Sequence, residues 1–363
     1  MAAATLPERM RAVLLTGHGG YEQLAYREDV AVPRPGRGEV LIRVAAAGVN
    51  NTDVNTRVGW YSKGVRDATG AGGEGFAGAT AADAGWAGTP LSFPRIQGAD
   101  CCGRVVAVGD GVDASRIGER VLVRPLLRHP DEPPPACWTF GADRDGAFAE
   151  YATAPADEAY PVDCAWTDAE LASLPCAYST AENLLHRAGV RAGERVLVTG
   201  ASGGVGSAAV QLARRRGAEV TAIAAPEKAD ALLAIGASRV LPRDSSLPDE
   251  LGASIDVVVD VVAGPGWPGL LDVLVRGGRL ATSGAIGGPI VELDVRTLYL
   301  RDLTLLGCTY QDEEVFASLV GYVEHGEIEP LVARTYPLQE IVQAQRDFLA
   351  KGFVGKLVLE VPG

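Results

Sequence analysis

The sequence lacks several features on which large classes of protein depend. No apolar stretch approaches the roughly 20 residues that a membrane-spanning helix needs. The six cysteines form no Cys-x-x-Cys pair, so we interpret them as small buried side chains in a reducing compartment. Positive charge is scarce as well, because 33 Lys and Arg stand against 46 Asp and Glu and leave a formal net charge of −13. This negative field repels phosphate backbones and argues against nucleic acid as a partner.

A targeting segment is also missing. The N-terminal residues do not have the layout of a signal peptide, so we expect a cytoplasmic protein that neither spans nor binds a membrane. Glycine, by contrast, is abundant, with 45 residues among 363, and aromatic residues make up only 6%. At roughly 100–200 residues per domain, this length predicts two domains. The composition is typical of an α/β protein with many tight turns.

The pattern of the chain changes along its length. Residues 10–160 contain short β-branched runs separated by Gly, Pro and Asp turns, which is typical of a β-rich domain. Within them, residues 62–92 form a long insertion, rich in Gly and Ala over much of its length, that we expect at the surface. From residue 195 onward strands and helices alternate, and the apolar run at 256–262 indicates a strand buried on both faces. This part predicts a doubly wound parallel sheet.

The strongest functional signal is a glycine-rich turn within RVLVTGASGGVGSAAVQLARRRGAEV, residues 195–220, between a predicted strand and a predicted helix. The first glycine allows a sharp turn off the strand, and the next two let the backbone approach a pyrophosphate. The N-terminus of the helix then offers free N–H groups to the phosphates. The alternative is a glycine turn without a ligand. We predict dinucleotide binding by Gly200, Ser202, Gly203, Gly204, Val205 and Gly206.

The end of the second strand bears on the choice of cofactor. Sites that prefer NAD usually end this strand with an acid that binds the ribose 2′-hydroxyl. Here the strand at 219–224 is followed by Ala225 and Pro226, and Lys228 comes shortly after. A cation at this place suits a 2′-phosphate, so we predict NADP(H), with Lys228 as a ligand. Alternatively, Lys228 is a solvated residue in the first turn of a helix.

Five segments of the chain resemble one family in their order and spacing. They cover nearly the whole chain and read AAAGVNNTDVNTRVGWY (45–61), DGAFAEYATAP (145–155), LPCAYSTAENLL (174–185), VRGGRLATSGA and FVGKLVLEV. The sequence resembles the medium-chain dehydrogenase/reductase superfamily, and within it the zinc-free quinone oxidoreductase branch.

This resemblance implies a particular α/β architecture. It has a GroES-like β-rich catalytic domain, split between residues 1–164 and the returning tail 309–363, around a Rossmann domain at 165–308. The active site is expected in the cleft between the two. Relatives commonly dimerise through the last strands of their Rossmann sheets, so we expect a homodimer joined near residues 303–306.

The resemblance also argues against a metal. Zinc-dependent relatives carry a Cys where this chain has Asn50 and a His–Glu pair where it has Ala99 and Asp100. Only Cys176 remains at a position that resembles a zinc ligand, whereas a catalytic zinc needs about three protein ligands. We therefore predict no metal.

Without a Lewis acid, hydride transfer from NADPH to a small quinone, enone or other carbonyl acceptor is the expected reaction. By resemblance, Asn50 lies near the nicotinamide as a catalytic and cofactor-binding residue, and Thr180 lies near the cleft as a cofactor-binding residue. Tyr61 is a candidate donor to a substrate oxygen, although packing alone would also explain it. Asn55 and the insertion at 62–92 differ from the quinone reductase pattern and argue against a quinone. The alternatives are an enoyl-thioester reductase and a non-catalytic NADPH-binding protein.

Overall fold

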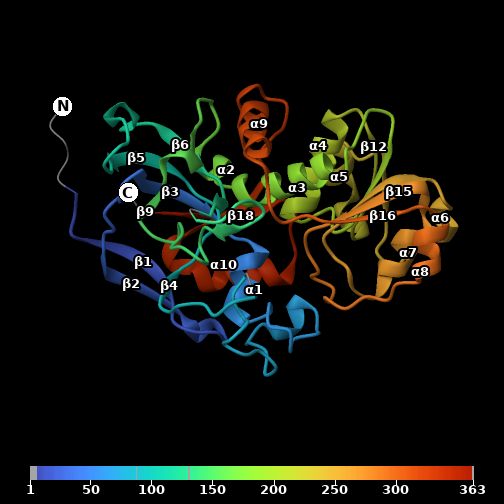
Figure 1. Cartoon of the computed structure of the whole chain (residues 1–363), viewed down its shortest axis with the longest axis horizontal. Coiled ribbons are helices and arrows are strands. Elements are labelled where there is room, and N and C mark those ends of the chain that lie inside the picture. The colour runs from blue at the N-terminus through green and yellow to red at the C-terminus, as the bar shows by residue number, and fades with distance from the viewer. Residues whose placement is uncertain (1–5, 87, 130, 362–363) are drawn as a thin grey trace.

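The computed structural model describes residues 6–86, 88–129 and 131–361. Two domains lie side by side along its long axis (Figure 1). The catalytic domain is built from the two ends of the chain, and the cofactor domain is built from the middle. No helix in the described part of the chain is long and apolar enough to cross a membrane.

The catalytic domain is mainly β-structure. Its strands are β1 (Arg9–Leu15), β2 (Leu24–Ala31), β3 (Glu39–Gly48), β4 (Arg95–Ile96), β5 (Cys102–Val108), β6 (Arg120–Val123), β7 (Leu126–Arg128), β8 (Cys137–Thr139), β9 (Tyr151–Pro155), β10 (Ala159–Pro161), β17 (Val332–Pro337) and β18 (Lys356–Glu360). The main sheet has the order β10-β6-β5-β3-β18-β17, with β9 also paired to β3. A β2-β1-β4 sheet and a β7-β8 pair complete the domain.

The cofactor domain contains the doubly wound sheet that the alternating pattern predicts. Its strands are β11 (Arg195–Val198), β12 (Glu219–Ile223), β13 (Arg239–Leu241), β14 (Ile255–Asp260), β15 (Leu274–Thr282) and β16 (Thr304–Gly307). They pair in parallel in the order β13-β12-β11-β14-β15-β16. Three consecutive valines of β14 are fully buried, as expected of a central strand covered on both faces. The helices that surround the sheet are α4 (Gly204–Arg215), α5 (Ala229–Ala234), α6 (Leu247–Leu251), α7 (Trp267–Asp272) and α8 (Val295–Leu300).

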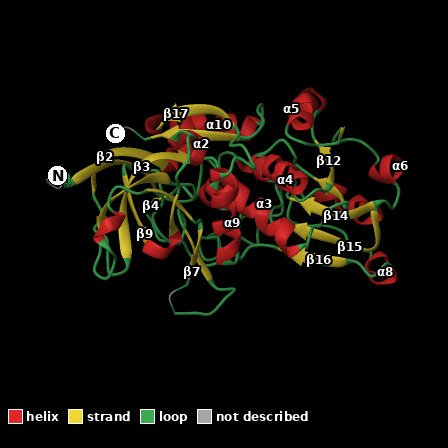
Figure 2. Ribbon diagram, turned by 90° about the horizontal axis from the view of Figure 1, so that it is seen from above, coloured by secondary structure: helices red, strands yellow, loops and turns green. Residues whose placement is uncertain are grey.

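The remaining α-helices of the described residues are α1 (Asn51–Val58), α2 (Asp168–Leu171), α3 (Pro175–Arg187), α9 (Glu313–Glu324) and α10 (Ile341–Ala350). Of these, α3 packs against α4 of the cofactor domain and against α9, whereas α10 packs on β17 and β18 of the catalytic domain. Figure 2 shows α3 and α9 between the two sheets. One apolar core runs from the cofactor sheet through Tyr178 of α3 to Phe316 of α9. The Tyr178 hydroxyl donates to the carbonyl of Glu329 at 2.7 Å, which fixes α3 against the returning chain.

The end of the chain completes the catalytic sheet. β18 inserts between β3 and β17, antiparallel to β3 and parallel to β17. In this register Val358 lies opposite Gly48, at the end of β3 that leads into α1. The first residue of β18, Lys356, therefore lies near the start of α1, where the resemblance places the active site.

Candidate active site

The glycine turn links β11 to α4 and has the geometry of a phosphate cradle. Gly200 has a φ of +57°, which side chains rarely adopt, so the sharp turn requires glycine. A Cβ atom on Gly206 would lie 2.3 Å from the carbonyl oxygen of Gly200, so the helix packs against the turn only without one. At Gly203 a Cβ would find nothing closer than 3.4 Å. Gly203 therefore borders open space, as a ligand-facing residue should.

The N-terminus of α4 is free to bind an anion. Gly203 occupies the N-cap position, and no side chain in the described structure caps the helix there. The N–H groups of its first turn are therefore available to phosphate oxygens. Ser202 lies on the same turn and is buried, while Val205 is partly buried in the first turn of α4. The residues of this turn fit the pyrophosphate of a dinucleotide.

Lys356 extends from β18 to the glycine turn. A Cβ on Gly204 would lie 2.7 Å from the Cδ atom of Lys356, so the absent side chain at Gly204 makes room for the lysine. The backbone N–H of Gly355 also donates to the carbonyl of Ser202 at 3.0 Å. These contacts hold the catalytic domain and the cofactor turn together.

The buried carboxylate of Asp100 bonds to three parts of the chain. Its Oδ2 atom lies 2.9 Å from the ammonium group of Lys356, and the two side chains are 0% and 2% exposed. The same oxygen accepts a hydrogen bond from Nδ2 of Asn50 at 2.8 Å. Its Oδ1 atom accepts from the backbone N–H of Cys176 at 2.6 Å, at the start of α3. Asp100 thereby fixes α1, α3 and β18 relative to one another.

Both ends of the Asn50 amide are engaged by the protein. Its Nδ2 group donates to Asp100 and, at 3.3 Å, to the carbonyl of Gly48, while its Oδ1 atom accepts from Lys356. Its backbone N–H donates to Asp53, which caps α1. The pKa of Asp53 is raised to about 7, mainly by burial and also by the charge of Asp100, against the lowering effect of backbone hydrogen bonds. Asn50 is therefore held rigidly and has no unused amide hydrogen.

These residues do not fit a zinc ion. The described residues contain no group of three or more His, Cys, Asp or Glu side chains placed to hold a metal. Asp100 already pairs with the ammonium group of Lys356, and Ala99 offers no ligand atom. A lysine cation thus sits beside the carboxylate that a metal site would use.

Three lysines surround the glycine turn. The ammonium group of Lys228, just after β12, donates to the carbonyl of Lys351 at 2.6 Å and lies 3.4 Å from the hydroxyl of Ser202. Lys351 follows α10, and Lys356 begins β18. The pKa of Lys351 is lowered to about 7, mainly by burial and also by the positive charges of Lys228 and Lys356. Only Lys356 has a carboxylate partner among the described residues, so this corner can accept an anion.

Tyr61 follows α1 and Thr180 lies on α3, so the two side chains come from different elements. The hydroxyl of Tyr61 donates to the hydroxyl of Thr52 in α1 at 3.1 Å. Burial raises the pKa of Tyr61 to about 12, so the phenol stays protonated at neutral pH. Thr180 is half-buried on α3, one helical turn after Cys176 and on the same face. Asn50 and Cys176 both bond to Asp100. Lys228 lies apart from them, next to Ser202 of the glycine turn.

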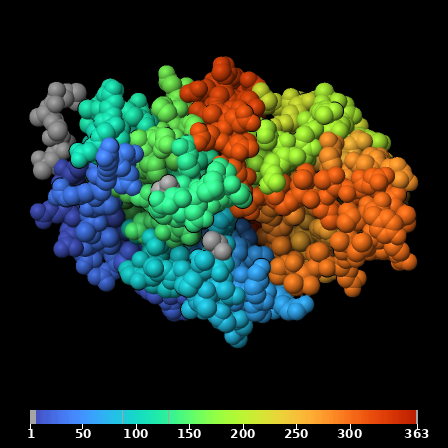
Figure 3. Space-filling model, in the orientation of Figure 1, coloured from blue at the N-terminus to red at the C-terminus, as the bar shows by residue number. Residues whose placement is uncertain are grey.

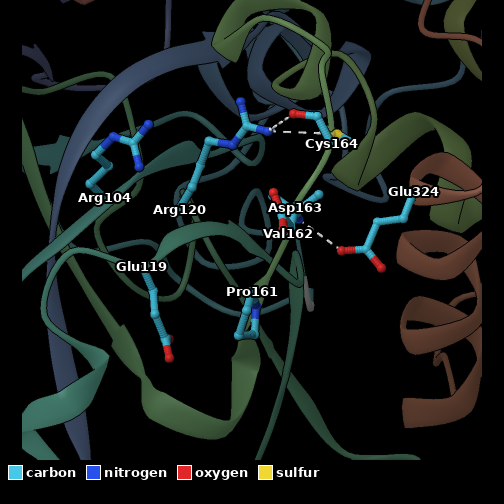
Figure 4. A pocket seen from close by; sticks show the side chains of 8 residues that line it. All are labelled: Arg104, Glu119, Arg120, Pro161, Val162, Asp163, Cys164 and Glu324. Atoms are coloured by element: carbon cyan, nitrogen blue, oxygen red, sulfur yellow. Dashed lines mark hydrogen bonds between the residues drawn. The ribbon is translucent and has the colours of Figure 1, made fainter.

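A surface hollow elsewhere is not this site. It has a volume of about 470 Å³ and is lined by residues of β5, β6 and α9 and of the segment after β10 (Figure 4). Arg120 donates to the carbonyl of Cys164, and the N–H of Asp163 donates to Glu324. None of the predicted site residues lines it. The glycine turn therefore remains the candidate site.

A glycine turn at the carboxyl end of a central parallel strand, facing a second β domain, is the arrangement of a two-domain dinucleotide oxidoreductase. Two family models match the chain: Alcohol dehydrogenase GroES-like domain at residues 36–164 and Zinc-binding dehydrogenase at residues 204–324. The quinone oxidoreductase of Rattus norvegicus is 30% identical over 371 residues, covering 98% of this chain and 99% of that protein. The chain belongs to the medium-chain dehydrogenase/reductase superfamily, whose members are oxidoreductases that bind nicotinamide cofactors.

Other relatives span the same length. A crystal structure from Sinorhizobium meliloti 1021 that carries an alcohol dehydrogenase name is 48% identical, with a TM-score of 0.89 and 98% of each chain covered. The acryloyl-coenzyme A reductase of Metallosphaera sedula is 29% identical over 367 residues, covering 96% of this chain and 99% of that protein. The predicted superfamily and the predicted GroES-like and Rossmann fold are confirmed.

Sequence reasoning did not identify Lys351, and it gave Lys356 and Asp53 no role. Lys356 lies in the FVGKLVLEV segment that carries the resemblance, but the sequence does not predict which residues it contacts. Asp100 was considered only as a departure from a zinc ligand pair. In the structure, Asp100 instead bonds to Asn50, Cys176 and Lys356.

Proposed function

We propose that this chain is an NADPH-dependent, zinc-independent oxidoreductase that transfers hydride to a small enone, quinone or other carbonyl acceptor. The observation that carries the proposal is the ion pair between Lys356 and Asp100 beside the glycine turn. A cation built into the protein balances the buried carboxylate, so the network needs no metal for its charge. The relatives named quinone oxidoreductase and acryloyl-coenzyme A reductase support an electron-poor acceptor.

The lysines explain the choice of cofactor. The free N–H groups of α4 would bind the pyrophosphate. Lys228 lies next to Ser202 and its ammonium group also bonds to the backbone carbonyl of Lys351, on the side of the turn reached from β12, where the 2′-phosphate of the adenosine ribose would lie. No acid ends β12, which favours NADPH over NADH.

The remaining groups position the reaction. When bound, NADPH supplies the hydride. Asp100 and Lys356 hold the Asn50 side chain in place, so Asn50 would present a fixed surface to the nicotinamide from the catalytic domain. Thr180 would contact the cofactor from α3. Tyr61 keeps its proton on Oη, and by releasing Thr52, to which it donates in the structure, it can polarise an acceptor oxygen through a hydrogen bond, while water supplies the proton that the product takes up.

The enoyl-thioester alternative rests on one observation, the similarity to acryloyl-coenzyme A reductases over nearly the whole chain. A non-catalytic NADPH-binding role would use the same turn and lysines. The acceptor that supports turnover distinguishes these alternatives from the proposal. An enoyl-thioester reductase would reduce acryloyl-coenzyme A, and a non-catalytic protein would reduce no acceptor.

The test is NADPH oxidation by the purified chain over a panel of enals, enones, quinones and acryloyl-coenzyme A. We expect turnover with small enals or enones that survives extended dialysis against a chelator. Metal analysis should find less than stoichiometric zinc. Tight NADPH binding with no turnover across the panel would favour the non-catalytic role, and chelator-sensitive turnover with stoichiometric zinc would refute metal independence.

A further inference from the structure

The segment between α1 and β4 links the catalytic domain to the cofactor domain at the cleft. The backbone N–H of Thr69 donates to the carbonyl of Ile286, in the loop between β15 and α8, at 3.2 Å. In Figure 3, blue-to-cyan atoms of this segment lie against orange atoms of the cofactor domain near the lower edge. Residues 61–72 are called the bridge below.

The bridge is anchored to α1. The hydroxyl of Thr69 donates to Oδ1 of Asn55 at 3.0 Å, and these residues are 2% and 5% exposed. Tyr61, at the other end of the bridge, donates to Thr52 in the same helix. A residue of the bridge therefore bonds to the catalytic domain through its side chain and to the cofactor domain through its backbone.

The rest of the insertion fastens the start of the bridge. Asp83 accepts a hydrogen bond from the hydroxyl of Ser62 at 2.7 Å and from the backbone N–H of Lys63 at 2.9 Å. The hydroxyl of Thr80 donates to it as well. Hydrogen bonds from the Thr80 and Ser62 hydroxyls lower the pKa of Asp83 to about 2, so it is ionised at neutral pH. The insertion is thus a connected structure built around one carboxylate.

Ile286 lies where the nicotinamide half of a cofactor belongs. In doubly wound sheets the dinucleotide lies outside the carboxyl ends of the strands. Since Lys228 after β12 marks the adenosine side of the glycine turn, the other half extends over the ends of β14 and β15. The loops after these two strands are joined by the hydrogen bond from the N–H of Gly287 to the carbonyl of Val262, at 2.8 Å.

We propose that the bridge is the wall of the acceptor site and restricts it to small enals and enones. By tying α1 to the loop after β15, it closes one side of the cleft next to the nicotinamide. A two-ring quinone would need the Thr69–Ile286 contact to open, whereas a short enone would not. This inference rests on the proposed function, because it assigns acceptor size at the same site.

One substitution removes the contact with little change to the backbone. Thr69 is the first residue of a short 3-10 helix, Thr69–Gly72, and Ala68 before it has φ −62° and ψ +147°. Proline is tolerated at the first position of a helix and requires an extended residue before it, so Thr69→Pro fits this backbone. Thr69→Pro removes both the N–H and the hydroxyl. The control Thr69→Val removes only the hydroxyl and keeps the N–H that reaches Ile286.

The first readout is the ratio of kcat/KM for menadione to kcat/KM for but-3-en-2-one, with NADPH. We expect Thr69→Pro to raise this ratio about three- to tenfold, the factor that one hydrogen bond contributes. Thr69→Val should raise it by less than half as much. An equal ratio in Thr69→Pro and wild type, or an equal rise in the two variants, would overturn the proposal.

The second readout does not need turnover. Hydrogen exchange of the NADPH-bound protein should show faster exchange in peptides covering the bridge and residues 284–288 in Thr69→Pro, and wild-type exchange at 284–288 in Thr69→Val. Unchanged exchange in Thr69→Pro would refute the bridge even if every acceptor were inactive. Absence of turnover in wild type with altered exchange in Thr69→Pro would instead refute the proposed reaction and leave the interdomain contact established.

Discussion

Three oxygen atoms surround the ammonium group of Lys356: the carbonyl of Val49, the amide oxygen of Asn50 and a carboxylate oxygen of Asp100. An ammonium group has three N–H donors, and each has an acceptor here. Lys356 therefore has no donor left over and acts by fixing its neighbours. Lys356 contributes to the proposed reaction by holding the Asn50 side chain in a fixed position.

Removing this cation should destabilise the protein. Lys356→Met leaves the Asp100 carboxylate buried and unbalanced, which typically costs about 3–5 kcal/mol. We expect the free energy of unfolding, from urea denaturation, to fall by about that amount. Adding Asp100→Asn should recover part of the loss, because the remaining amide carries no charge. Lys63→Met, at an exposed lysine, is the control. Equal stability of Lys356→Met and this control would contradict the buried ion pair.

NADPH binding should depend on pH through Lys351. Its pKa in the free protein is about 7, and a bound phosphate raises it because opposite charges favour the protonated amine. Above pH 7, binding therefore takes up a proton, so the Kd for NADPH should increase from pH 7 to pH 9, by at most about tenfold per pH unit. Calorimetric titrations in buffers of different ionisation enthalpy measure both quantities.

Lys351→Met provides the control for this pH effect. The variant should bind NADPH more weakly than wild type at pH 7 and lose most of the pH dependence. NADH, which lacks the 2′-phosphate, should show a smaller dependence with either protein. A constant Kd for NADPH from pH 7 to pH 9 in wild type would show that Lys351 does not face the phosphate.

Single residues were predicted from the sequence only where a local pattern marked them. The turn glycines and Lys228 lie within 30 residues of one another and belong to one strand–helix–strand unit, so their roles could be inferred together. Lys351 comes more than 100 residues after Lys228, and no local periodicity links the two. Only the fold, which brings the segment around β18 against α4, reveals the lysine cluster.

At the scale of elements, the sequence predicts the type of the strands and helices around the glycine turn better than their ends, and it does not predict β13, α6, α7 or α8. The sequence at 181–188 predicts a helix, and α3 begins earlier, at Pro175, because proline suits the first turn of a helix. The sequence at 227–235 also predicts a helix, which the structure divides into a 3-10 turn, Pro226–Lys228, and α5. This division places the Lys228 side chain on the glycine turn. The strand predicted at 303–306 is present as Thr304–Gly307.

The glycine turn gives a prediction at this scale. A Cβ on Gly203 has ordinary contacts, and its φ of −77° and ψ of +173° are allowed for any residue, so Gly203→Val should fold normally. The branched side chain would occupy the space next to the free N–H groups of α4. NADPH affinity, measured by fluorescence titration, should fall at least about a hundredfold.

The matched control is Gly269→Val in α7, where a Cβ meets nothing within 4 Å. Its melting temperature and NADPH affinity should stay close to those of wild type. If Gly203→Val keeps the wild-type affinity while folded, the turn does not hold the pyrophosphate.

At the scale of the whole molecule, one edge of the cofactor sheet carries exposed apolar side chains. β16 is the last strand of the sheet and pairs only with β15 among the described residues (Figure 2). Next to it in sequence, Val295, Tyr299 and Leu300 of α8 are 57–60% exposed. An unpaired edge with exposed apolar neighbours is typical of an interface between subunits.

We expect the chain to form a homodimer through this edge. Light scattering should give about twice the chain mass of 37.8 kDa. Tyr299→Glu combined with Leu300→Glu should shift the protein toward monomer, because a charge resists burial at an apolar interface. Ile117→Glu, at an equally exposed apolar residue of the catalytic domain, should leave the mass unchanged. A monomeric wild type at micromolar concentration would contradict the dimer.

The insertion of β18 between β3 and β17 has a consequence for the order in which the protein forms during synthesis. The cofactor domain is continuous in sequence and can begin to fold while the last residues are still being translated. β9 pairs with residues 39–43 on the edge of β3 that β18 joins, but the catalytic sheet cannot close until residues 356–360 leave the ribosome. Residues 46–48 of β3 therefore stay unpaired on this edge for about 310 residues of further synthesis. Lys356 arrives with this final strand. A chain that stops a few residues early would thus carry a complete cofactor domain beside an unfinished sheet, and such an open edge is a target for chaperones and proteases.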